Sequence, residues 1–518
     1  MKTAVLLLAA LLCAAPSDFD SAVLTLTGAG SMEELDETTL ERFRALSLHP
    51  VSLNTASRSR LLSCGLLNAF QVASLIEYRQ QTGDILSYTE LALVDGFPEP
   101  VADALSLFTV LESSGPPGKR SGRRIRQDVM LRGSMRSDEG SDPQAAGGLK
   151  YKLSLGERAE INWSARNTYS EPAAVPGIVS AAVYGRRYLG KLVLGHFNAR
   201  FGQGLAIWSG FSMSAYGSVE SLRRSGSGFS STGSFSPQLC GAAADFDLGR
   251  WSAGAAYSVP DGLPLGYLSY TSRTFTTGIA ASSEALSAHF QAGMKNTSVY
   301  GELAWKSGPQ AVCGVMWVPS YGNKAGAVLR YVNGVPEAIA GVRIKGLESV
   351  TALSSRQFRI MARYSRPLQL RNSSLTPSVR LAARNNGAWR LEGRGELQLD
   401  AGGWMLRSRL DAVCCQGLSW LVNAEAARTR EPLRVWLRWT LFKVEDWSGR
   451  IYVYERDVPG CFNVRAYYGK GWALSAYGAW KLSRRHAVYL RASYIAYPWN
   501  TTEKPTRTEV RLQYQLSL

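Results

Sequence analysis

Charged side chains alternate with apolar ones between residues 389 and 400. Arg390, Glu392, Arg394 and Glu396 share one parity, and the residues between them are leucine or glycine. Guanidinium and carboxylate groups of this kind can bind water, ions and charged solutes, provided that they stay solvated or paired. Because a strand places alternate side chains on opposite faces, the segment predicts a strand with one polar and one apolar face. The apolar face must border either a soluble core or a lipid bilayer.

Side chains that usually carry catalysis or bind metals are sparse. The chain has 4 His, widely scattered, and 7 Cys that show no CxxC and no regular spacing. Zinc sites and disulfide frameworks normally show such spacing. No Ser/His/Asp set and no nucleotide-binding loop can be assembled from local motifs. We therefore expect no catalytic residues, no metal, no cofactor and no enzymatic activity, although an outer-membrane hydrolase built from distant residues stays open.

The alternation of the 389–400 segment recurs from about residue 128 to the C-terminus. Arg359 and Arg363 oppose apolar residues in one segment, and Arg434 and Arg438 do so in another. Segments of about ten residues with this pattern, separated by turn residues, are typical of a spanning β-barrel. A soluble sandwich or β-propeller is the alternative, but its dry core would leave so many charged side chains unsolvated. We expect the arginines and glutamates to line a wet lumen.

The length of this region sets the size of the predicted barrel. About 390 residues at roughly 17–20 residues for each strand and turn predict roughly 20–24 antiparallel strands. The last strand resembles the assembly signal of outer-membrane barrels, although it ends in Leu518 rather than Phe. This resemblance implies the barrel assembly machinery and outer-membrane lipid as partners.

The N-terminus has the features of an export signal. Lys2 precedes an apolar run from Ala4 to Leu12, and Ala14 and Ala15 follow. A basic start, a short apolar run and small residues predict a signal peptide over residues 1–17. We therefore expect a bacterial outer-membrane location, with the N-terminal domain in the periplasm. Lipidation at Cys13 stays open.

Residues 18–114 have helical rather than strand-like patterning. Two tight turns interrupt them, one at Gly65, Leu66 and Leu67, and one at Gly96, Phe97 and Pro98. The helices that we expect are Glu33–Leu46, one running from a cap at Asn54 or Thr55 to Leu62, Phe70–Gln80, Glu90–Val94 with Thr89 as its cap, and Pro100–Phe108.

This pattern resembles a tandem helix-hairpin-helix domain of the ComEA-like type. The residues that carry the resemblance are Leu53-Asn54-Thr55-Ala56, Ala73, Ile76, Tyr78-Arg79, Glu90-Leu91 and Val94-Asp95-Gly96. In that family each hairpin is usually Gly-x-Gly, and its backbone N–H groups hold a DNA phosphate. Here Leu67 and Pro98 replace the second glycines. Leu67 makes a left-handed backbone costly, and Pro98 removes a donor, so both phosphate hairpins are degraded.

Net charge divides the chain into two unlike parts. Residues 18–117 contain five basic and fourteen acidic residues, a net charge of −9, whereas residues 118–518 contain 52 basic and 27 acidic residues, a net charge of +25. An acidic domain is a poor ligand for DNA phosphates, so nucleic acid is a disfavoured partner. The basic linker of residues 115–127 is either a solvated tether or a contact for anionic lipid.

One stretch interrupts the strand rhythm after Arg200. It begins with Gly202, Gln203, Gly204 and Trp208 and continues as a Gly/Ser-rich segment to Phe235, with Arg223 and Arg224 inside it. Connections longer than about 12–15 residues are usually functional or disordered. This one either folds into the lumen as a constriction or forms an external loop, and the sequence leaves both open.

Together these features predict a small α-helical N-terminal domain followed by a large antiparallel transmembrane β-barrel over residues 128–518. The combination resembles the helix-hairpin-helix outer-membrane proteins of Bacteroidetes-type bacteria, a resemblance that implies no particular activity. The opposite charges favour a pore whose N-terminal domain docks acid-to-base at the periplasmic mouth as a plug or adaptor. A DNA-uptake port and a scaffold that binds a periplasmic protein are the alternatives.

Overall fold

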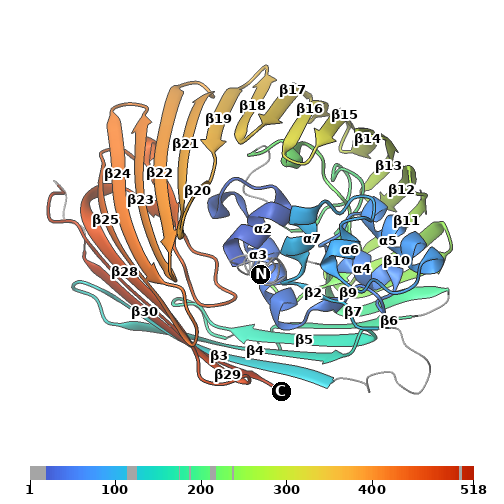
Figure 1. Ribbon diagram of the computed structural model, residues 1–518, viewed down its shortest axis with the longest axis horizontal. Coiled ribbons are helices and arrows are strands. Elements are labelled where there is room, and N and C mark those ends of the chain that lie inside the picture. The colour runs from blue at the N-terminus through green and yellow to red at the C-terminus, as the bar shows by residue number, and fades with distance from the viewer. Residues whose placement is uncertain are drawn as a thin grey trace, which may run out of the picture.

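A bundle of short helices lies inside a large closed β-barrel (Figure 1). This computed structural model describes residues 19–113, 125–173, 175–185, 188–210, 217–235, 239–500 and 505–518. The predicted signal peptide, Cys13 and most of the predicted linker lie outside the described residues.

Each strand of the barrel wall pairs antiparallel with the next along the chain. The described residues form 24 wall strands, within the range that the sequence predicts. The last strand closes the barrel on the first, with Leu516 opposite Val129. The wall strands are β3 Ile125–Asp138, β4 Gln144–Leu155, β5 Ala159–Arg166, β6 Ile178–Tyr184, β7 Leu189–Arg200, β9 Leu239–Leu248, β10 Trp251–Ser258, β11 Leu263–Thr271, β12 Phe275–Ser282, β13 Ala285–Met294, β14 Thr297–Lys306, β15 Pro309–Ser320, β16 Asn323–Val332, β17 Val335–Ile344, β18 Leu347–Ser354, β19 Phe358–Ser365, β21 Ser373–Asn385, β22 Trp389–Ala401, β23 Trp404–Cys414, β24 Leu418–Arg428, β25 Leu433–Val444, β28 Gly469–Lys481, β29 His486–Ala496 and β30 Arg507–Ser517. Two short strands, β8 Gly228–Ser231 and β20 Leu368–Leu370, pair beside them.

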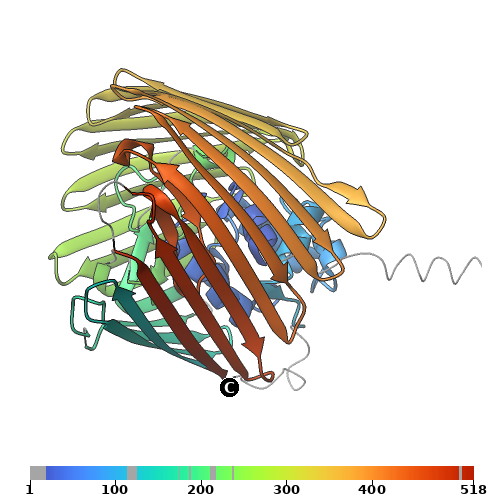
Figure 2. The same cartoon turned by 90° about the vertical axis from the view of Figure 1, so that its left-hand side faces the viewer.

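Alternation along the strands separates a polar inside from an apolar outside. On β22, Arg390 is 7% exposed, whereas its neighbours Trp389 and Leu391 are 55% and 50% exposed. Leu410 and Leu437 on nearby strands are similarly exposed, while Arg409 and Arg438 are buried. On these strands the outer face is therefore apolar, and the charged parity points inward. Figure 2 shows that the strands run obliquely around the barrel, as closure of a sheet requires.

The two edges of the barrel differ in their connections. We call the edge that carries Ile125 and Leu518 the terminal rim, and the opposite edge the far rim. Short turns join the strands at the terminal rim. At the far rim, two long connections fold back inside the barrel. The first, after β7, contains η2 Glu220–Leu222 and β8, and the second, the inward hairpin of residues 445–468, contains η3 Trp447–Gly449, β26 Ile451–Tyr454 and β27 Val464–Tyr467.

The N-terminal residues 19–113 form a compact helical unit with its own apolar core. Phe43 and Phe108 meet edge to face at 5.0 Å at the centre of this core. The elements of the unit are α2 Phe19–Thr27, η1 Met32–Glu34, α3 Glu37–Leu48, β1 Val51–Ser52, α4 Arg58–Ser63, α5 Ala69–Gln81, α6 Tyr88–Leu91, α7 Glu99–Leu105 and β2 Thr109–Val110. A short parallel pairing of β1 with β2 ties the two ends of the unit together.

Local side-chain hydrogen bonds explain where the predicted helices were misplaced. The prediction that Asn54 or Thr55 caps a helix is wrong, because α4 begins at Arg58 with Ser57 as its cap. Asn54 instead clamps the backbone of Ile85, donating to its oxygen and accepting from its nitrogen at 2.9 Å each. Ser87, rather than Thr89, caps α6. The predicted helix at Glu33 begins later, at Glu37, because the Asp36 carboxylate accepts from Thr39 N at 2.7 Å.

Candidate functional site

Buried ion pairs hold the helical unit against one side of the lumen. Glu33 lies 2.6 Å from Arg409 Nη1 on β23 and 3.6 Å from Arg394 Nη1 on β22. Glu34 pairs with Arg363 on β19 at 3.5 Å. Burial alone would raise the pKa of the Glu33 carboxyl, but the two arginines lower it well below its ordinary value. The carboxylate is therefore charged, and acids of the unit meet bases of the wall on this side.

On the opposite side of the unit, the unit supplies the base and the wall supplies the acids. Arg60 Nη1 on α4 lies 2.9 Å from Glu160 on β5 and donates to the Tyr184 hydroxyl at 3.0 Å. Arg60 Nε lies 3.3 Å from Glu157 in the turn between β4 and β5. Although burial opposes the charge of Arg60, these groups raise its pKa above the ordinary value. Because the unit is fixed to β5 and to β23 at once, it lies inside the barrel and not only at its mouth.

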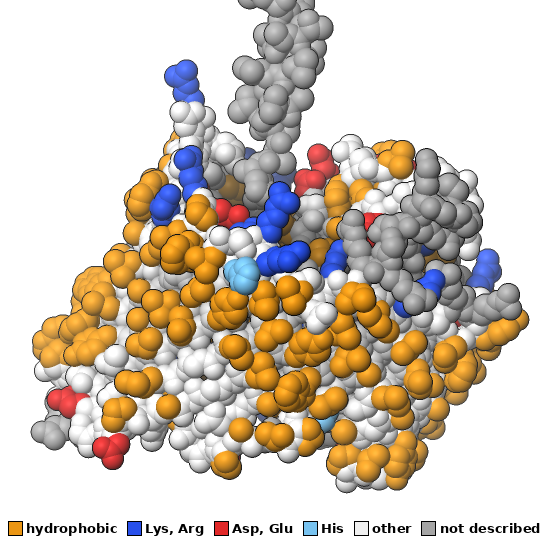
Figure 3. Space-filling view, turned by 90° about the horizontal axis from the view of Figure 1, so that it is seen from below, with side chains coloured by type: hydrophobic (Ala, Val, Ile, Leu, Met, Phe, Trp, Pro, Cys, Tyr) orange, Lys and Arg blue, Asp and Glu red, His pale blue; other side chains and the backbone are white. Residues whose placement is uncertain are grey.

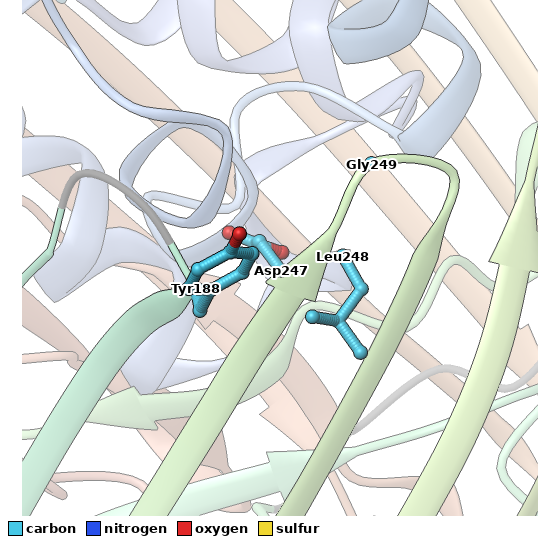
Figure 4. Close-up of a pocket in the computed structure, with 4 residues that line it drawn as sticks. All are labelled: Tyr188, Asp247, Leu248 and Gly249. Atoms are coloured by element: carbon cyan, nitrogen blue, oxygen red, sulfur yellow. The ribbon is translucent and has the colours of Figure 1, made fainter.

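The start of α4 also contacts the terminal rim. The Ser59 hydroxyl donates to Asp247 Oδ2 at 2.6 Å, and Arg58 Nη1 donates to the carbonyl oxygen of Gly249 at 2.7 Å. Figure 4 shows Asp247 and Gly249 beside Tyr188 and Leu248, around a shallow surface pocket. Since Asp247 and Gly249 already bind the unit, this pocket belongs to the contact between unit and wall.

The inward hairpin covers the unit from the far-rim side. Arg44 Nη1 on α3 donates to the carbonyl oxygens of Val458 and Cys461, at 3.4 and 3.2 Å. Asp20 on α2 pairs with Arg456 at 2.7 Å. The side chain of Tyr454 belongs to the apolar core of the unit. Helical unit and hairpin therefore share one packed interior.

The two turns that resemble phosphate-binding hairpins are covered by different side chains. Gly65 and Gly96 have positive φ values of 65° and 92°, as tight turns require. The guanidinium of Arg42 fills the space beside Gly65 that a Cβ would need. Leu66 is half-buried, Leu67 and Phe97 are buried, and Pro98 occupies the N-cap position of α7 without a capping hydrogen bond. Neither turn therefore presents a pair of free glycine N–H groups.

The segment after Arg200 lies on the inner face of the wall in its described part. The Gln203 and Leu205 amides donate to Glu302 on β14, at 2.6 and 3.2 Å. Tyr300 on the same strand donates its hydroxyl to the carbonyl oxygen of Leu222 at 2.9 Å. Val219 N donates to Glu348 on β18 at 2.7 Å. Inward-facing carboxylates of the wall therefore hold this segment by its backbone.

Arginines of this segment surround one tryptophan. Trp208 lies under Arg200 and Arg224, with the guanidinium carbons 5.6 and 5.3 Å from its ring centroid. Gly204 and Gly202 allow the chain to pass close to Trp208 and to Glu302, where a Cβ would clash. Arg200 Nε also donates to Ser209 O at 3.0 Å, and Arg223 Nη1 donates to Ser298 Oγ at 3.3 Å. The segment thus adds positive charge to the lumen.

Six inward arginines form two cross-strand rows on β19, β21 and β22. Arg359 lies opposite Arg384, which lies opposite Arg390, and Arg363 lies in the same way opposite Arg380 and then Arg394. Like charges directly opposite each other destabilise a sheet unless counter-charges separate them.

Carboxylates compensate these arginine rows only in part. Glu392 lies 2.6 Å from Arg390, Asp411 lies 2.8 Å from Arg394, and Arg363 Nε donates to Glu348 at 2.6 Å. Arg380 Nε has no hydrogen-bond partner, and Arg359 has none among the described residues. Of the other predicted lumen charges, Glu396 pairs with Arg407 at 3.1 Å, Arg438 pairs with Glu425, and Arg434 shares their inward parity.

Strand pairing explains which functional residues sequence reasoning missed. The alternation found Arg359, Arg363 and Arg390 on their own strands, but the rows arise only when the strands are aligned. Arg380 and Arg384 were missed although they also alternate with apolar neighbours. The signal that could have found them is the matching parity of β21.

Comparisons with known proteins find only distant likenesses. No family model and no curated protein matches the chain. Among solved structures, the OpdK outer-membrane protein of Pseudomonas aeruginosa is 11% identical, covers 76% of this chain and 99% of its own, and gives a TM-score of 0.32. The OccD3 protein of the same organism is 10% identical, with coverages of 77% and 92% and a TM-score of 0.34. The P pilus usher (PapC) translocation pore is 8% identical, with coverages of 76% and 99% and a TM-score of 0.40. The function of this chain must therefore be argued from its own geometry.

Two further properties of the described residues bear on the site. They contain no group of His, Cys, Asp and Glu arranged to hold a metal ion. Their helices are all too short or too polar to cross a bilayer.

Proposed function

We propose that the protein is a non-enzymatic outer-membrane barrel whose anion-preferring lumen is closed by its own N-terminal unit. The observation that carries this proposal is the pair of buried contacts on opposite sides of the lumen, Glu33 with Arg409 and Arg60 with Glu160. A unit held on two sides can block the space between them. The unit would be a helix-hairpin-helix type domain that faces the periplasm, with its DNA-binding turns lost.

The outer surface supports the membrane part of the proposal. Large apolar side chains cover the wall at outward positions, including Leu303 at 68%, Leu329 at 66% and Leu437 at 55% exposure. A soluble protein rarely exposes a contiguous apolar surface of this extent. Lipid would cover it, whereas inward Arg390 and Arg409 would face the unit and water. Figure 3 shows the apolar band on one side of the barrel, with Lys and Arg gathered above it.

The two rims differ in charge, which supports one orientation in the membrane. In the described turns, the terminal rim carries ten basic residues, all exposed, and two acidic residues, whereas the short far-rim connections carry one basic and five acidic residues. The terminal-rim residues are Arg158, Arg250, Arg273, Lys295, Lys345, Arg366, Arg371, Arg430, Arg484 and Arg485 against Glu157 and Glu431, and the far-rim residues are Arg356 against Glu139, Asp142, Glu171, Asp261 and Glu284. A basic rim fits a leaflet of anionic phospholipid headgroups. The terminal rim and the helical unit would therefore face the periplasm.

The arginine rows support a preference for anions. Arg359 and Arg380 form no ion pair with a described carboxylate and Arg384 has only Glu392 at 3.9 Å, so the rows keep a surplus of inward positive charge. A positive lumen wall attracts anions and excludes cations. The nucleic-acid alternative has less support, because Arg42 covers Gly65, and Asp95 beside the second turn pairs with Arg273.

Conductance across a planar bilayer tests the proposal. The full chain is compared with a variant lacking residues 19–113. Electrophoretic migration of both proteins before heating first shows that their barrels are folded. We expect a small or absent current from the full chain and a large current from the variant, with a reversal potential that favours chloride over potassium. Equal currents from the two proteins would exclude closure by the unit. A cation-favouring reversal potential would exclude the anion preference independently.

A further inference from the structure

A partly open cavity of about 160 Å³ lies between the helical unit and the wall. Helices α3 and α4 line it on one side, and β3, β4, β5 and β7 line it on the other. The segment of residues 227–234 and the tip of the inward hairpin at Pro459 and Gly460 complete the lining. The cavity is therefore assembled only when unit, wall and hairpin are in contact.

Positive side chains dominate the lining. Six cations and three carboxylates face the cavity, a surplus of three positive charges, and these residues are Arg42, Arg44, Arg60, Lys150, Lys152 and Arg200 against Glu41, Asp128 and Glu160. Two of these carboxylates pair with a cation, and the third contacts a histidine that its lowered pKa keeps neutral. Glu160 pairs with Arg60 at 2.9 Å, Glu41 pairs with Lys150 at 3.3 Å, and Asp128 contacts His49.

Two of the cations form no direct ion pair, although carboxylates act on both from farther away, Asp36 on Arg42 and Glu160 with Asp128 on Lys152. Arg42 and Lys152 form no ion pair with a described carboxylate, and Arg42 Nε is buried without a hydrogen-bond acceptor. Burial lowers the pKa of the Arg42 guanidinium. Burial, together with the positive charges of Lys152 and Arg126, lowers the pKa of His49 to about 3. The cavity thus combines positive potential with unused donors, and buried unpaired charges are strongly unfavourable.

The other lining groups suit an oxyanion. Arg44 and Arg200 donate only to backbone carbonyls among their described partners, and both can reorient a fork of N–H donors. Ser227, Ser230 and Ser231 contribute hydroxyl groups along one edge. Guanidinium, ammonium and hydroxyl donors around a small cavity are the groups that bind phosphate.

We propose that this cavity binds a compact dianionic oxyanion, a phosphate or sulfate group that is free or part of a small solute, and that the bound anion fastens the helical unit to the wall. The anion would supply the acceptors that Arg42 of the unit and Lys152 of the wall lack. Because these two residues belong to different parts of the molecule, one ligand bridges them. The binding stands on the cavity alone, and the fastening rests on the proposed closure of the lumen.

Calorimetric titration of the full chain in a zwitterionic detergent tests the binding. Inorganic phosphate, sulfate and acetate are titrated at constant low ionic strength into the wild type, R42Q, K152M and R273Q. Arg273 is the matched control, because its ion pairs with Glu77 and Asp95 also join unit and wall but lie on the exposed terminal rim. We expect saturable phosphate or sulfate binding in the wild type and R273Q, and binding at least ~10-fold weaker in R42Q and K152M. Acetate should bind weakly, because a single charge cannot satisfy both cations.

Each contrary outcome has a distinct meaning. No saturable binding of phosphate or sulfate at millimolar concentration, or equal binding by K152M and the wild type, would overturn the oxyanion site. Migration of each variant before and after heating shows whether its barrel is folded. Conductance recorded with and without phosphate then tests the fastening. Phosphate should reduce current bursts in the wild type and not in K152M, whereas bound phosphate without any effect on the current would overturn the fastening alone.

Discussion

The two sides of the contact between helical unit and wall are held by opposite charge arrangements. At β19, β22 and β23 the unit supplies acids, Glu33 and Glu34, to arginines of the wall. At β5 the unit supplies Arg60 to Glu157 and Glu160 of the wall. The net charges of −9 for the N-terminal part and +25 for the rest of the chain account only for the first of these contacts. Net charge predicts long-range attraction between the parts, but burial decides which pairs form at contact.

Breaking the contact at β5, where the unit supplies the base, should have the largest effect. Arg60→Gln leaves Glu160 buried without its cation, and breaking a buried pair in this way costs about 3–5 kcal/mol. We expect the unit to detach from the wall more often, so that the variant shows current bursts more frequently than the wild type. Arg58→Gln is the control, because Arg58 is more exposed and binds one carbonyl oxygen. A silent Arg60→Gln variant would show that the β5 side does not hold the unit.

Breaking the contact at β22 and β23, where the unit supplies the acid, should have a smaller effect. Glu33→Gln leaves Arg409 and Arg394 paired with Asp411, so little uncompensated charge remains. We expect a loss of about 1–3 kcal/mol in the seating of the unit, as for a lost hydrogen bond to a charged group. The rate of protease cleavage within the unit is measured for Glu33→Gln and for Arg60→Gln, and the slower cleavage is expected for Glu33→Gln. Faster cleavage of Glu33→Gln would reverse the ranking of the two sides.

Acidification should weaken the contact between the helical unit and the wall. Glu33 has a lowered pKa and His49 a pKa lowered to about 3 in the folded state. A group with a lowered folded pKa stabilises the fold above its unfolded pKa and loses that contribution as pH falls toward the folded value. We expect the loss from His49 to begin near pH ~6.5 and that from Glu33 near pH ~4.3, their unfolded pKa values. His49→Gln should abolish the part between pH 6.5 and 4.5, measured as current bursts, and an unchanged pH profile would exclude a role of His49.

The exposed rim pair should contribute least. Arg273 with Glu77 and Asp95 joins unit and wall in open solvent, where ion pairs are screened. We expect Arg273→Gln to leave conductance and protease resistance unchanged. A clear change in either would mean that the terminal rim, and not the buried contacts, holds the unit.

The sequence was informative where a single strand or turn contains the whole signal. The parity of Arg390 and Leu391 predicts the inside and outside of the wall, and strand length predicts its size. The ion pair of Arg60 with Glu160 could not be predicted from the sequence. It joins the helical unit to the wall, and no local sequence pattern specifies how these two parts dock. Asn54 was misread as a cap, because its long-range bond to Ile85 competes with local capping.

The most direct test of a unit that sits in the lumen and closes it is a reversible tether. In a background whose native cysteines are Ser, Ser59→Cys and Asp247→Cys are combined with Arg60→Gln, and conductance is recorded before and after reduction. The Ser59 hydroxyl lies 2.6 Å from Asp247 Oδ2, so the paired thiols can be oxidised or bridged by a short reagent. We expect no current while the tether is intact and an anion-preferring current once the tether is reduced. The same current in both states would contradict closure of the lumen by the unit.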